Sequence, residues 1–407
     1  MTETRGTGPL QGIRVIDLTT VLMGPYATQI LADYGADVIK VEPPEGDVMR
    51  KAAPMRHADM SAVHLQANRN KRSIVLDAKK PGGRQALLRL AATADVFIHN
   101  VRLSAMRRLR LAYEDLRAVN PRIVYASLIG YGEDGPYAGR PAYDDLIQGV
   151  SGIAMLFTYV GSEPRYVPLN VADRVVGLNA VHAVLAAVIH RDRTGEGQAV
   201  DVPMFETMAQ FVLGDHMGGR SFEPPLGPPG YGRLLTANRR PHRTRDGYIS
   251  VLVYNDKQWE ALFRLLGDTP LAADPRLADH ATRARHYDEI YGLLGEILGT
   301  RTTAEWVALF EARDIPCVVP HDLDSLIDDP HLAAVGFFRR VDHPTEGPLN
   351  LVGTPSRWSW SSPAEMNPAP RLGEHSVEIL REAGYGDADI EALLTEGATL
   401  DGRVSAR

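Results

Sequence analysis

Asp173 is the residue whose position in this sequence best suits covalent chemistry. It follows Val167 and Pro168 and begins a long apolar segment with the composition of a buried helix. An acidic residue at such a position commonly caps the free N–H groups of the first helical turn. The same N–H groups stabilise the ionised carboxylate, which keeps it available as a nucleophile at neutral pH. Attack by this carboxylate on a thioester would give an acyl–aspartyl anhydride and would need no metal or cofactor.

A basic segment upstream indicates which substrates could reach that carboxylate. Residues 50–110 contain 14 Lys or Arg residues and three acidic residues, in a chain with a formal net charge of −7. A local cationic field in an acidic protein attracts a small polyanion better than nucleic acid. We therefore expect a nucleotide-tailed substrate. Arg50, Lys71, Arg72 and Arg102 are weaker candidates for phosphate contacts, and a solvated basic face is the alternative for all four.

The sequence lacks the motifs of several other kinds of chemistry. The first strand–helix turn, residues 19–29, has one glycine and none of the G-x-G-x-x-G pattern that lets a backbone approach a dinucleotide pyrophosphate. Ser151 has isoleucine where a nucleophile elbow requires its second glycine. The 13 histidines show no zinc-hydrolase pairing, and the single Cys317 excludes a disulfide framework and a cysteine-based metal cluster. We expect neither a metal nor a bound cofactor.

Bulk properties predict a soluble, cytoplasmic protein of two domains. A chain of 407 residues with 44% hydrophobic residues can bury a large core. It has no run of 18 apolar residues, and residues 1–12 lack the apolar stretch of a signal peptide. One cysteine fits a reducing compartment. A sequence pI near 6.0 argues against nucleic acid as the main partner, and we expect no membrane partner.

The elements that would hold Asp173 and the basic segment alternate between strand and helix. Short β-rich runs separated by helix-length segments predict an α/β fold, with a parallel sheet covered by helices on both faces. The clearest helix covers 175–191. The other expected elements are strands at 13–18, 37–42, 73–77, 96–100, 123–127 and 199–203 and helices at 26–34, 84–92, about 204–213 and 377–384.

A change in composition marks the connection to a second domain. Residues 222–232 contain four prolines and three glycines. A strand at 247–254 and helices near 256–266 and 303–312 then indicate a smaller α+β domain. We predict a large domain from residues 1–221 and 325–407 and a small domain from residues 222–324.

Blocks of sequence spread over nearly the whole chain resemble the family III CoA-transferases (the CaiB/BaiF family). This family includes formyl-CoA and carnitine CoA-transferases and alpha-methylacyl-CoA racemase. The blocks occur in the family's order and spacing. They are PLQGIRVIDLTTVLMGPYATQILADYGADVIKVEPPEGD at 9–47, NRNKRSIVLDAKKPGG at 68–83, GYGEDGPYAGRPAYDDLIQGVSG at 130–152, HRDRTGEGQAVDV at 190–202, DPHLAAVGFF at 329–338 and LGEHSVEIL at 372–380.

The resemblance implies an interlocked homodimer with a Rossmann-like, CoA-binding large domain formed by both termini. It implies an enzyme that uses an acyl-CoA and a carboxylic acid as substrates. Asp173 aligns with the aspartate that the transferases acylate. Positions that the family uses for CoA and acyl contacts correspond here to Val21, Leu22, Met23, Leu76, Lys79, Asn100, Val101, Arg108, Tyr143 and Asp144.

Tyr143 separates the two main activities of the family. Racemase members carry a histidine at this position, which serves as one of two bases. An unperturbed tyrosine, with a pKa of about 10, accepts protons poorly at pH 7. Tyrosine followed by Asp144 therefore favours a CoA-transferase. A racemase or epimerase on the same fold, and a catalytically silent CoA-binding subunit, are the alternatives.

Two departures from formyl-CoA transferase leave details open. Pro43 and Pro44 stand where that enzyme has arginines after its second strand, so the adenine contacts must differ. Residues 218–232 contain no glycine run longer than the pair Gly218–Gly219. The flexible glycine loop that shields intermediates in formyl-CoA transferase is therefore not evident.

Overall fold

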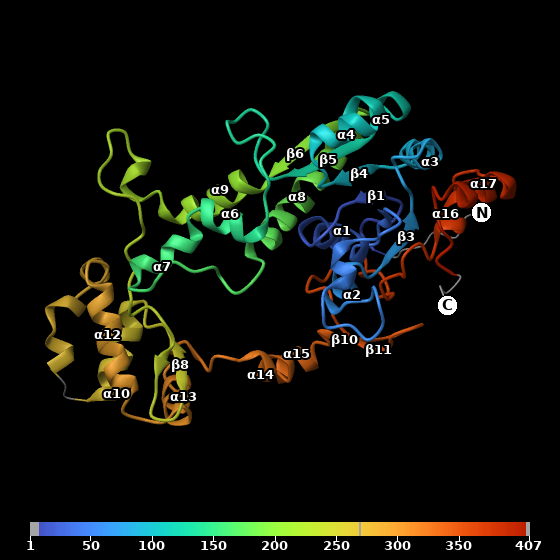
Figure 1. Cartoon of the computed structure of the whole chain (residues 1–407). Helices are drawn as coiled ribbons and strands as arrows, with labels where there is room; N and C mark the ends of the chain where they lie inside the picture. The colour runs from blue at the N-terminus through green and yellow to red at the C-terminus, as the bar shows by residue number, and fades with distance from the viewer. Residues whose placement is uncertain (1–7, 268–269, 404–407) are drawn as a thin grey trace. The chain divides into compact units, whose positions relative to one another are not determined.

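The computed structural model describes residues 8–267 and 270–403 (Figure 1). The chain forms two compact units. One consists of residues up to 151, 167–210 and 331 onward, and the other of 152–166 and 211–330. The first unit contains Asp173, every other predicted site residue and the whole of the basic segment.

The first unit is built on a parallel sheet of six strands. Their order, β3-β2-β1-β4-β5-β6, reverses direction between β1 and β4, and every neighbouring pair is parallel. Ligand sites in such sheets form outside the carboxyl ends of the strands at the reversal. The predicted α/β class with a parallel sheet is confirmed. The strands are β1 (Arg14–Leu18), β2 (Asp37–Glu42), β3 (Lys71–Val75), β4 (Val96–His99), β5 (Val124–Ile129) and β6 (Gln198–Pro203).

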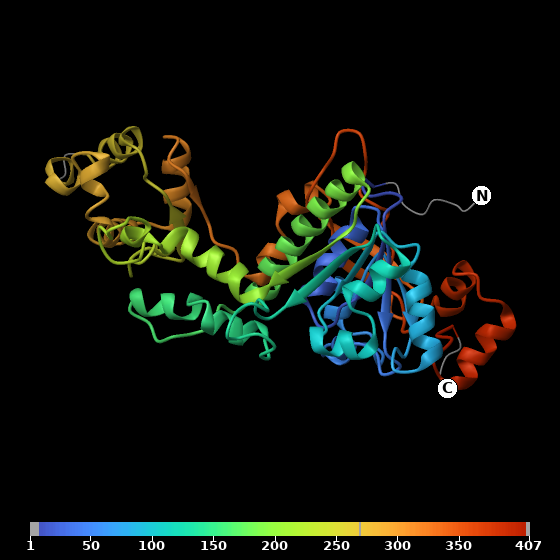
Figure 2. The ribbon, with the colours of Figure 1, turned by 90° about the horizontal axis from the view of Figure 1, so that it is seen from above.

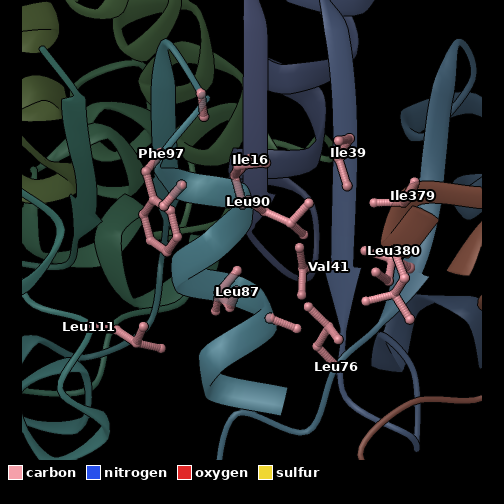
Figure 3. Packing of buried hydrophobic residues seen from close by; sticks show 14 of the residues in the cluster. Ile16, Ile39, Val41, Leu76, Leu87, Leu90, Phe97, Leu111, Ile379 and Leu380 are labelled. Carbon is pink, nitrogen blue, oxygen red and sulfur yellow. The ribbon is translucent and has the colours of Figure 1, made fainter. Parts of the chain in front are cut away.

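Helices cover both faces of this sheet. Side chains of successive strand residues point to opposite faces. Ile16 of β1 packs in a buried cluster with α3 (Pro81–Ala91) and α16 (Ser376–Glu382), which Figure 3 shows from close by. Its neighbour Asp17 accepts a hydrogen bond of 2.6 Å from Thr28 Oγ1 of α1 (Met23–Asp33), so α1 covers the opposite face.

Helix α8 (Val171–Thr194) packs against α1 and along β5 and β6 (Figure 2). Among the described residues it is the one helix long and apolar enough to cross a membrane by length and composition. Half of its most apolar window is buried within this chain. The buried half accounts for much of its apolar character, because that side packs in the core of the unit.

The first unit also contains elements that the sequence reasoning did not predict. These include a β-hairpin, a second C-terminal helix and several short helices. They are α2 (Ala62–Ala67), α4 (Leu103–Leu109), α5 (Tyr113–Val119), α6 (Asp144–Val150), α17 (Asp387–Glu396), β10 (Phe338–His343) and β11 (Gly347–Val352). Helix α9 (Met204–His216) starts in this unit and ends in the other, and α15 (Pro330–Ala334) lies at the return.

The second unit combines a small antiparallel sheet with helices. Its core contains Trp259, Leu294, Trp306 and Phe310. The three strands have the order β7-β8-β9. The elements are β7 (His242–Arg243), β8 (Tyr248–Val251), β9 (Cys317–Val318), α7 (Leu156–Tyr159), α10 (Asp256–Leu266), α11 (His280–Arg283), α12 (Tyr287–Leu298), α13 (Thr303–Glu311) and α14 (Leu323–Ile327).

Candidate active site

A cavity of about 620 Å³ opens outside the carboxyl ends of β1, β4 and β5, where the strand order reverses. Loops that leave these strands form its walls, together with the starts of α6 and α8. Its lining includes Thr20, Val21, Met23, Asn100, Val101, Arg102, Arg107, Leu128, Ile129, Glu133, Arg140, Tyr143, Asp144, Asn170, Asp173 and Met204.

Asp173 enters this cavity from the first turn of α8 and is 9% exposed. Its backbone N–H donates to Asp144 Oδ1 at 2.9 Å and is therefore not available to the carboxylate of Asp173 itself. The carboxylate itself makes no hydrogen bond or ion pair with any residue that the structure describes. The guanidinium of the adjacent Arg174 lies 4.3 Å from the centre of the Tyr26 ring and makes no ion pair with Asp173. Asp173 is therefore a nearly buried carboxyl without a compensating partner in the described chain.

The surroundings of Asp173 favour its protonated form more than the sequence suggested. Burial, and next the charge of Asp144, raise the pKa of Asp173 to about 7, while Arg174 opposes the shift. From the sequence we expected the N-terminus of α8 to favour the ionised form. The pKa of Asp173 is instead raised, because burial and the charge of Asp144 both oppose ionisation. Near neutral pH Asp173 populates both its ionised and its protonated form.

Gln148 of α6 links Asp144 to the chain that enters α8. Its Nε2 donates to Asp144 Oδ2 at 2.6 Å and to the Leu169 carbonyl oxygen at 3.2 Å, and its Oε1 accepts the Val167 N–H at 2.8 Å. Sequence reasoning missed this residue. The available signal was its spacing of four from Asp144, which places both side chains on one face of a helix.

The start of α1 lies across from Asp173. Gly177 is one turn further along α8, on the same face as Asp173. A Cβ at Gly177 would lie 2.8 Å from the Met23 carbonyl oxygen and 3.0 Å from Tyr26 Cδ1. Glycine therefore permits the close approach of α8 to α1. Val21 and Met23, at the start of α1, line the same cavity as Asp173.

Asn100 joins the ends of β1 and β4. The Thr20 N–H donates to Asn100 Oδ1 at 2.9 Å, and Asn100 Nδ2 donates back to the Thr20 carbonyl oxygen at 2.8 Å. This reciprocal pair fixes two loops of the cavity wall relative to each other. Asn100 thus has a structural task beside the CoA contact predicted for it.

The structure brings most of the predicted site residues together. Leu22 and Leu76 are instead buried in the fold, and Figure 3 shows Leu76 in the cluster beside α3. Lys79 and Arg108 are exposed and do not line the cavity. For these four residues the CoA contact stays a prediction. The cavity contains Val21, Met23, Asn100, Val101, Tyr143, Asp144 and Asp173.

Three of the weaker candidates in the basic segment have a different role. Arg50, Lys71 and Arg72 are buried. Arg50 Nη2 lies 2.6 Å from Glu42 Oε2. Lys71 Nζ lies 3.0 Å from Asp17 Oδ2, and Arg72 Nη2 lies 2.7 Å from Asp37 Oδ2. The idea of a solvated basic face is wrong for all three, and their charges are neutralised by carboxylates outside the segment.

Other cations line the cavity. Arg102 is exposed there and pairs with no carboxylate among the described residues. Arg107 Nη2 lies 3.6 Å from Glu133 Oε2, and the Arg140 guanidinium lies 4.3 Å from the centre of the Tyr137 ring. Sequence reasoning missed Arg107 and Arg140, although Arg140 stands three residues before Tyr143. The described residues contain no group of three or more His, Cys, Asp or Glu arranged to hold a metal ion.

Comparison with known proteins gives one family. Residues 10–376 match the model of CoA-transferase family III. The chain is 36% identical to an acyl-CoA transferase of Fusarium pseudograminearum, covering 95% of this chain and 86% of that protein. It is also 36% identical to a succinate–glutarate CoA-transferase of Agrobacterium fabrum, covering 92% and 95%. Identity to the succinyl-CoA:glutarate CoA-transferase of Homo sapiens is 31%, covering 96% and 89%.

Solved structures agree with this result. A CAIB/BAIF family protein from Brucella suis has a TM-score of 0.78 and 34% identity, covering 93% of this chain and all of that chain. Rv3272 from Mycobacterium tuberculosis has a TM-score of 0.77 and 30% identity, covering 92% and 99%.

Proposed function

The chain belongs to CoA-transferase family III, and we propose that it moves CoA from an acyl-CoA donor to a free carboxylic acid through Asp173. One observation carries this proposal. Asp173 is a nearly buried carboxyl, without a partner among the described residues, in a cavity at the carboxyl ends of β1, β4 and β5. A nucleophile needs this freedom, whereas a carboxylate that only caps a helix would be hydrogen-bonded to N–H groups.

The proposed reaction has four substitution steps. The ionised Asp173 attacks the donor thioester carbonyl, forms an acyl–aspartyl anhydride and expels CoA thiolate. The thiolate attacks the aspartyl carbonyl, which gives an aspartyl–CoA thioester and releases the donor acid. The acceptor carboxylate then attacks this thioester and forms a second anhydride with release of the thiolate. Attack of the thiolate on the acceptor acyl carbonyl yields the new acyl-CoA and restores the Asp173 carboxylate.

Asp144 supports the first step in two ways. Its Oδ1 holds the backbone of Asp173 through the 2.9 Å hydrogen bond, which orients the start of α8. Its negative charge also repels the ionised Asp173 and contributes to the raised pKa of that carboxyl. Acylation turns Asp173 into a neutral anhydride, so this repulsion disappears as the bond forms. A destabilised carboxylate that is relieved by acylation is a more reactive nucleophile.

The cavity lining suits an acyl-CoA with a short acyl group. Arg102, Arg107 and Arg140 provide positive charge for phosphate or carboxylate groups. Val21, Met23, Val101, Ile129 and Met204 provide apolar surface for methylene groups. Most of the relatives with a named substrate are named for succinate, glutarate, formyl-CoA or oxalate, and one is named a probable fatty acyl-CoA transferase. We therefore propose small mono- and dicarboxylic acids as the acceptor class.

We further propose that the enzyme works as a homodimer of interlocked chains. Large apolar side chains are exposed on three helices of the single chain. A chain that exposes so many apolar side chains normally buries them against another subunit. A second copy would cover the exposed apolar side chains of α8, which lie outside the half of the helix that is buried within this chain. The exposed side chains are Leu146 and Val150 of α6, Leu178 and Ile189 of α8, and Phe211 and Leu213 of α9.

A racemase or epimerase is the second candidate, because a carboxyl with a pKa of about 7 is suited to proton transfer at neutral pH. The two reactions differ in the fate of the α-hydrogen. Incubation with a chiral 2-methylacyl-CoA in deuterated buffer would place deuterium at Cα in a racemase, whereas CoA transfer leaves that hydrogen in place. A silent CoA-binding subunit would show neither exchange nor transfer.

The test of the proposed function is a CoA-exchange assay. Purified protein is incubated with succinyl-CoA and isotopically labelled glutarate, and then with other acyl-CoA and acid pairs, and labelled acyl-CoA is measured by mass spectrometry. We expect label in the acyl-CoA pool with the wild type and none with Asp173→Ala. Glu391→Ala, a change of an exposed carboxylate of α17 outside the cavity, serves as the control and should retain the exchange. Full activity of Asp173→Ala would contradict the proposal.

A further inference from the structure

The turn between β1 and α1 contains a residue in an unfavourable backbone conformation. Val21 has a φ of 68°, in the left-handed region that β-branched residues rarely adopt. Its side chain lines the cavity that contains Asp173. Backbone strain of this kind persists only where neighbouring groups enforce it. The groups that enforce it here are therefore part of how the cavity is built.

Asp47 is the residue that holds Val21. Its Oδ1 accepts the Val21 N–H at 3.1 Å across 26 residues of sequence. Its Oδ2 accepts from Lys40 Nζ at 3.1 Å, and Lys40 also donates to the Thr19 carbonyl oxygen at 3.0 Å. The side chains of Asp47 and Lys40 are both fully buried. Lys40 and Asp47 therefore hold the turn through two hydrogen bonds, one to the Thr19 carbonyl oxygen and one from the Val21 N–H.

Asp47 also has local tasks that a purely structural residue would have. Its Oδ1 accepts the Met49 N–H at 3.0 Å, which caps the short 3-10 helix Val48–Lys51. Its own N–H donates to Glu42 Oε1 at 3.0 Å. These bonds fix Asp47 itself, so that its carboxylate presents a rigid acceptor to Val21. The bond to Val21 is the one that links Asp47 to the cavity.

We propose that Asp47 is a positioning residue, which holds Val21 in the left-handed conformation and so fixes the cavity wall near Asp173 before acyl-CoA binds. The contact of Gly177 with the Met23 carbonyl oxygen makes this wall relevant to Asp173, because it sets α1 directly against the nucleophile's helix. Without Asp47, Val21 relaxes to an ordinary conformation and the turn Thr19–Met23 moves. This inference rests on the proposed function, since it assigns the residue a task in that reaction.

The test compares the effect of Asp47→Ala in two backgrounds. Glycine adopts a positive φ readily, whereas alanine keeps a Cβ and the strain. We expect Asp47→Ala to lower kcat/KM about tenfold in the Val21→Ala background, the size of effect that one strained residue can supply. In the Val21→Gly background Asp47→Ala should lower kcat/KM by about threefold or less. Equal losses in both backgrounds, or no loss in either, would overturn the proposal.

Stability is measured alongside activity to separate positioning from folding. Thermal unfolding of each variant gives the loss of stability on Asp47→Ala, which includes the cap and the ion pair in both backgrounds and should be smaller in the Val21→Ala background, because relaxation there also releases the strain. If Asp47→Ala leaves Lys40 unpaired and fails to fold, Lys40→Met/Asp47→Ala replaces both charges and the comparison is repeated. Asp47→Asn keeps an acceptor for the Val21 N–H and should recover much of the activity in the Val21→Ala background.

The design also distinguishes this inference from the proposed function. If the wild type transfers no CoA, or Asp173→Ala is fully active, the proposed function fails before the variants are compared. If transfer depends on Asp173 and the two backgrounds respond alike to Asp47→Ala, only the positioning role fails. Calorimetric titration with CoA provides a readout without turnover, and its dissociation constant should follow the same pattern.

Discussion

The carboxylate of Asp144 accepts the backbone N–H of Asp173 at 2.9 Å, so two acidic residues meet at the start of one helix. One anchors the backbone and the other faces the cavity with no partner among the described residues. This arrangement accounts for the nearly neutral pKa of Asp173, since burial and the nearby charge both oppose ionisation. It also makes the reactivity of Asp173 dependent on pH and on Asp144.

The first prediction concerns the pH dependence of the reaction. Only the ionised Asp173 attacks a thioester, so kcat/KM should fall as the pH drops below about 7. Asp144→Asn retains an oxygen that can accept the Asp173 N–H but removes the charge. Its profile should therefore move to lower pH, with burial, the larger cause, keeping the pKa of Asp173 above that of a free carboxyl. Asp145→Asn is the control and should leave the profile in place. An unchanged profile for Asp144→Asn would contradict this account.

The second prediction concerns stability. A carboxyl whose pKa is higher in the folded than in the unfolded state binds its proton more tightly when folded. Its contribution to stability is present below about pH 4 and is lost as the pH rises through about 7. Asp173→Asn cannot ionise and therefore avoids this loss. Its free energy of unfolding should increase relative to that of the wild type between pH 4 and pH 8. We expect a gain on the order of 2 kcal/mol in the free energy of unfolding, measured by urea denaturation. A gain that does not vary with pH would exclude this explanation.

The third prediction concerns the contact between α1 and α8. Gly177→Ala would place a methyl group 2.8 Å from the Met23 carbonyl oxygen, and the two helices would have to move apart. We expect a loss of about 1–3 kcal/mol in stability and a lower kcat. Gly214→Ala in α9 is the matched control, since its Cβ meets no atom within 4 Å in this chain. That change should be neutral or stabilising by up to about 1 kcal/mol. Thermal unfolding measures the stability of both variants, and the exchange assay measures their kcat.

Sequence reasoning reached the fold class and placed Asp173 at the start of a long helix because both depend on local patterns. Alternating strands and helices are visible along the chain, and Asp173 is in the first turn of the longest of those helices. The elements that were missed, such as α4, α5 and the hairpin β10–β11, are short and take their stability from tertiary packing rather than from a periodic pattern. Gln148 was missed for a similar reason, since its role depends on where the loop 167–169 passes.

The charges were the least predictable feature. Arg50, Lys71 and Arg72 looked like part of a cationic surface, but their partners Glu42, Asp17 and Asp37 lie outside the segment in sequence. The register of β2 beside β1 and β3 brings Lys71 to Asp17 and Arg72 to Asp37, whereas Arg50 reaches Glu42 from the short 3-10 helix that follows β2. Net charge along a sequence cannot reveal such pairing, because it depends on which strands become neighbours.

The fourth prediction follows from this distinction. Arg72→Met should lower the stability of the fold by about 1–3 kcal/mol, because it removes the buried cation between Asp37 and Glu382, while Arg14 still pairs with Asp37 at 2.9 Å. Any folded fraction should bind CoA with a dissociation constant close to that of the wild type. Arg102→Met, at the cavity, should do the opposite and weaken CoA binding about tenfold with little effect on unfolding. Calorimetry with CoA and urea denaturation separate the two effects, and equal CoA affinity in the wild type and Arg102→Met would show that Arg102 contacts no phosphate.

The most direct test of the central claim is a covalent adduct on Asp173. The wild type is mixed with a panel of acyl-CoAs, its intact mass is measured, and any adduct is located by peptide sequencing. We predict a mass increase that corresponds to an acyl or CoA group on Asp173 with at least one acyl-CoA, and no increase for Asp173→Asn. The absence of any adduct across the panel, together with entry of solvent deuterium at the α-carbon of a 2-methylacyl-CoA, would contradict the account and favour a racemase.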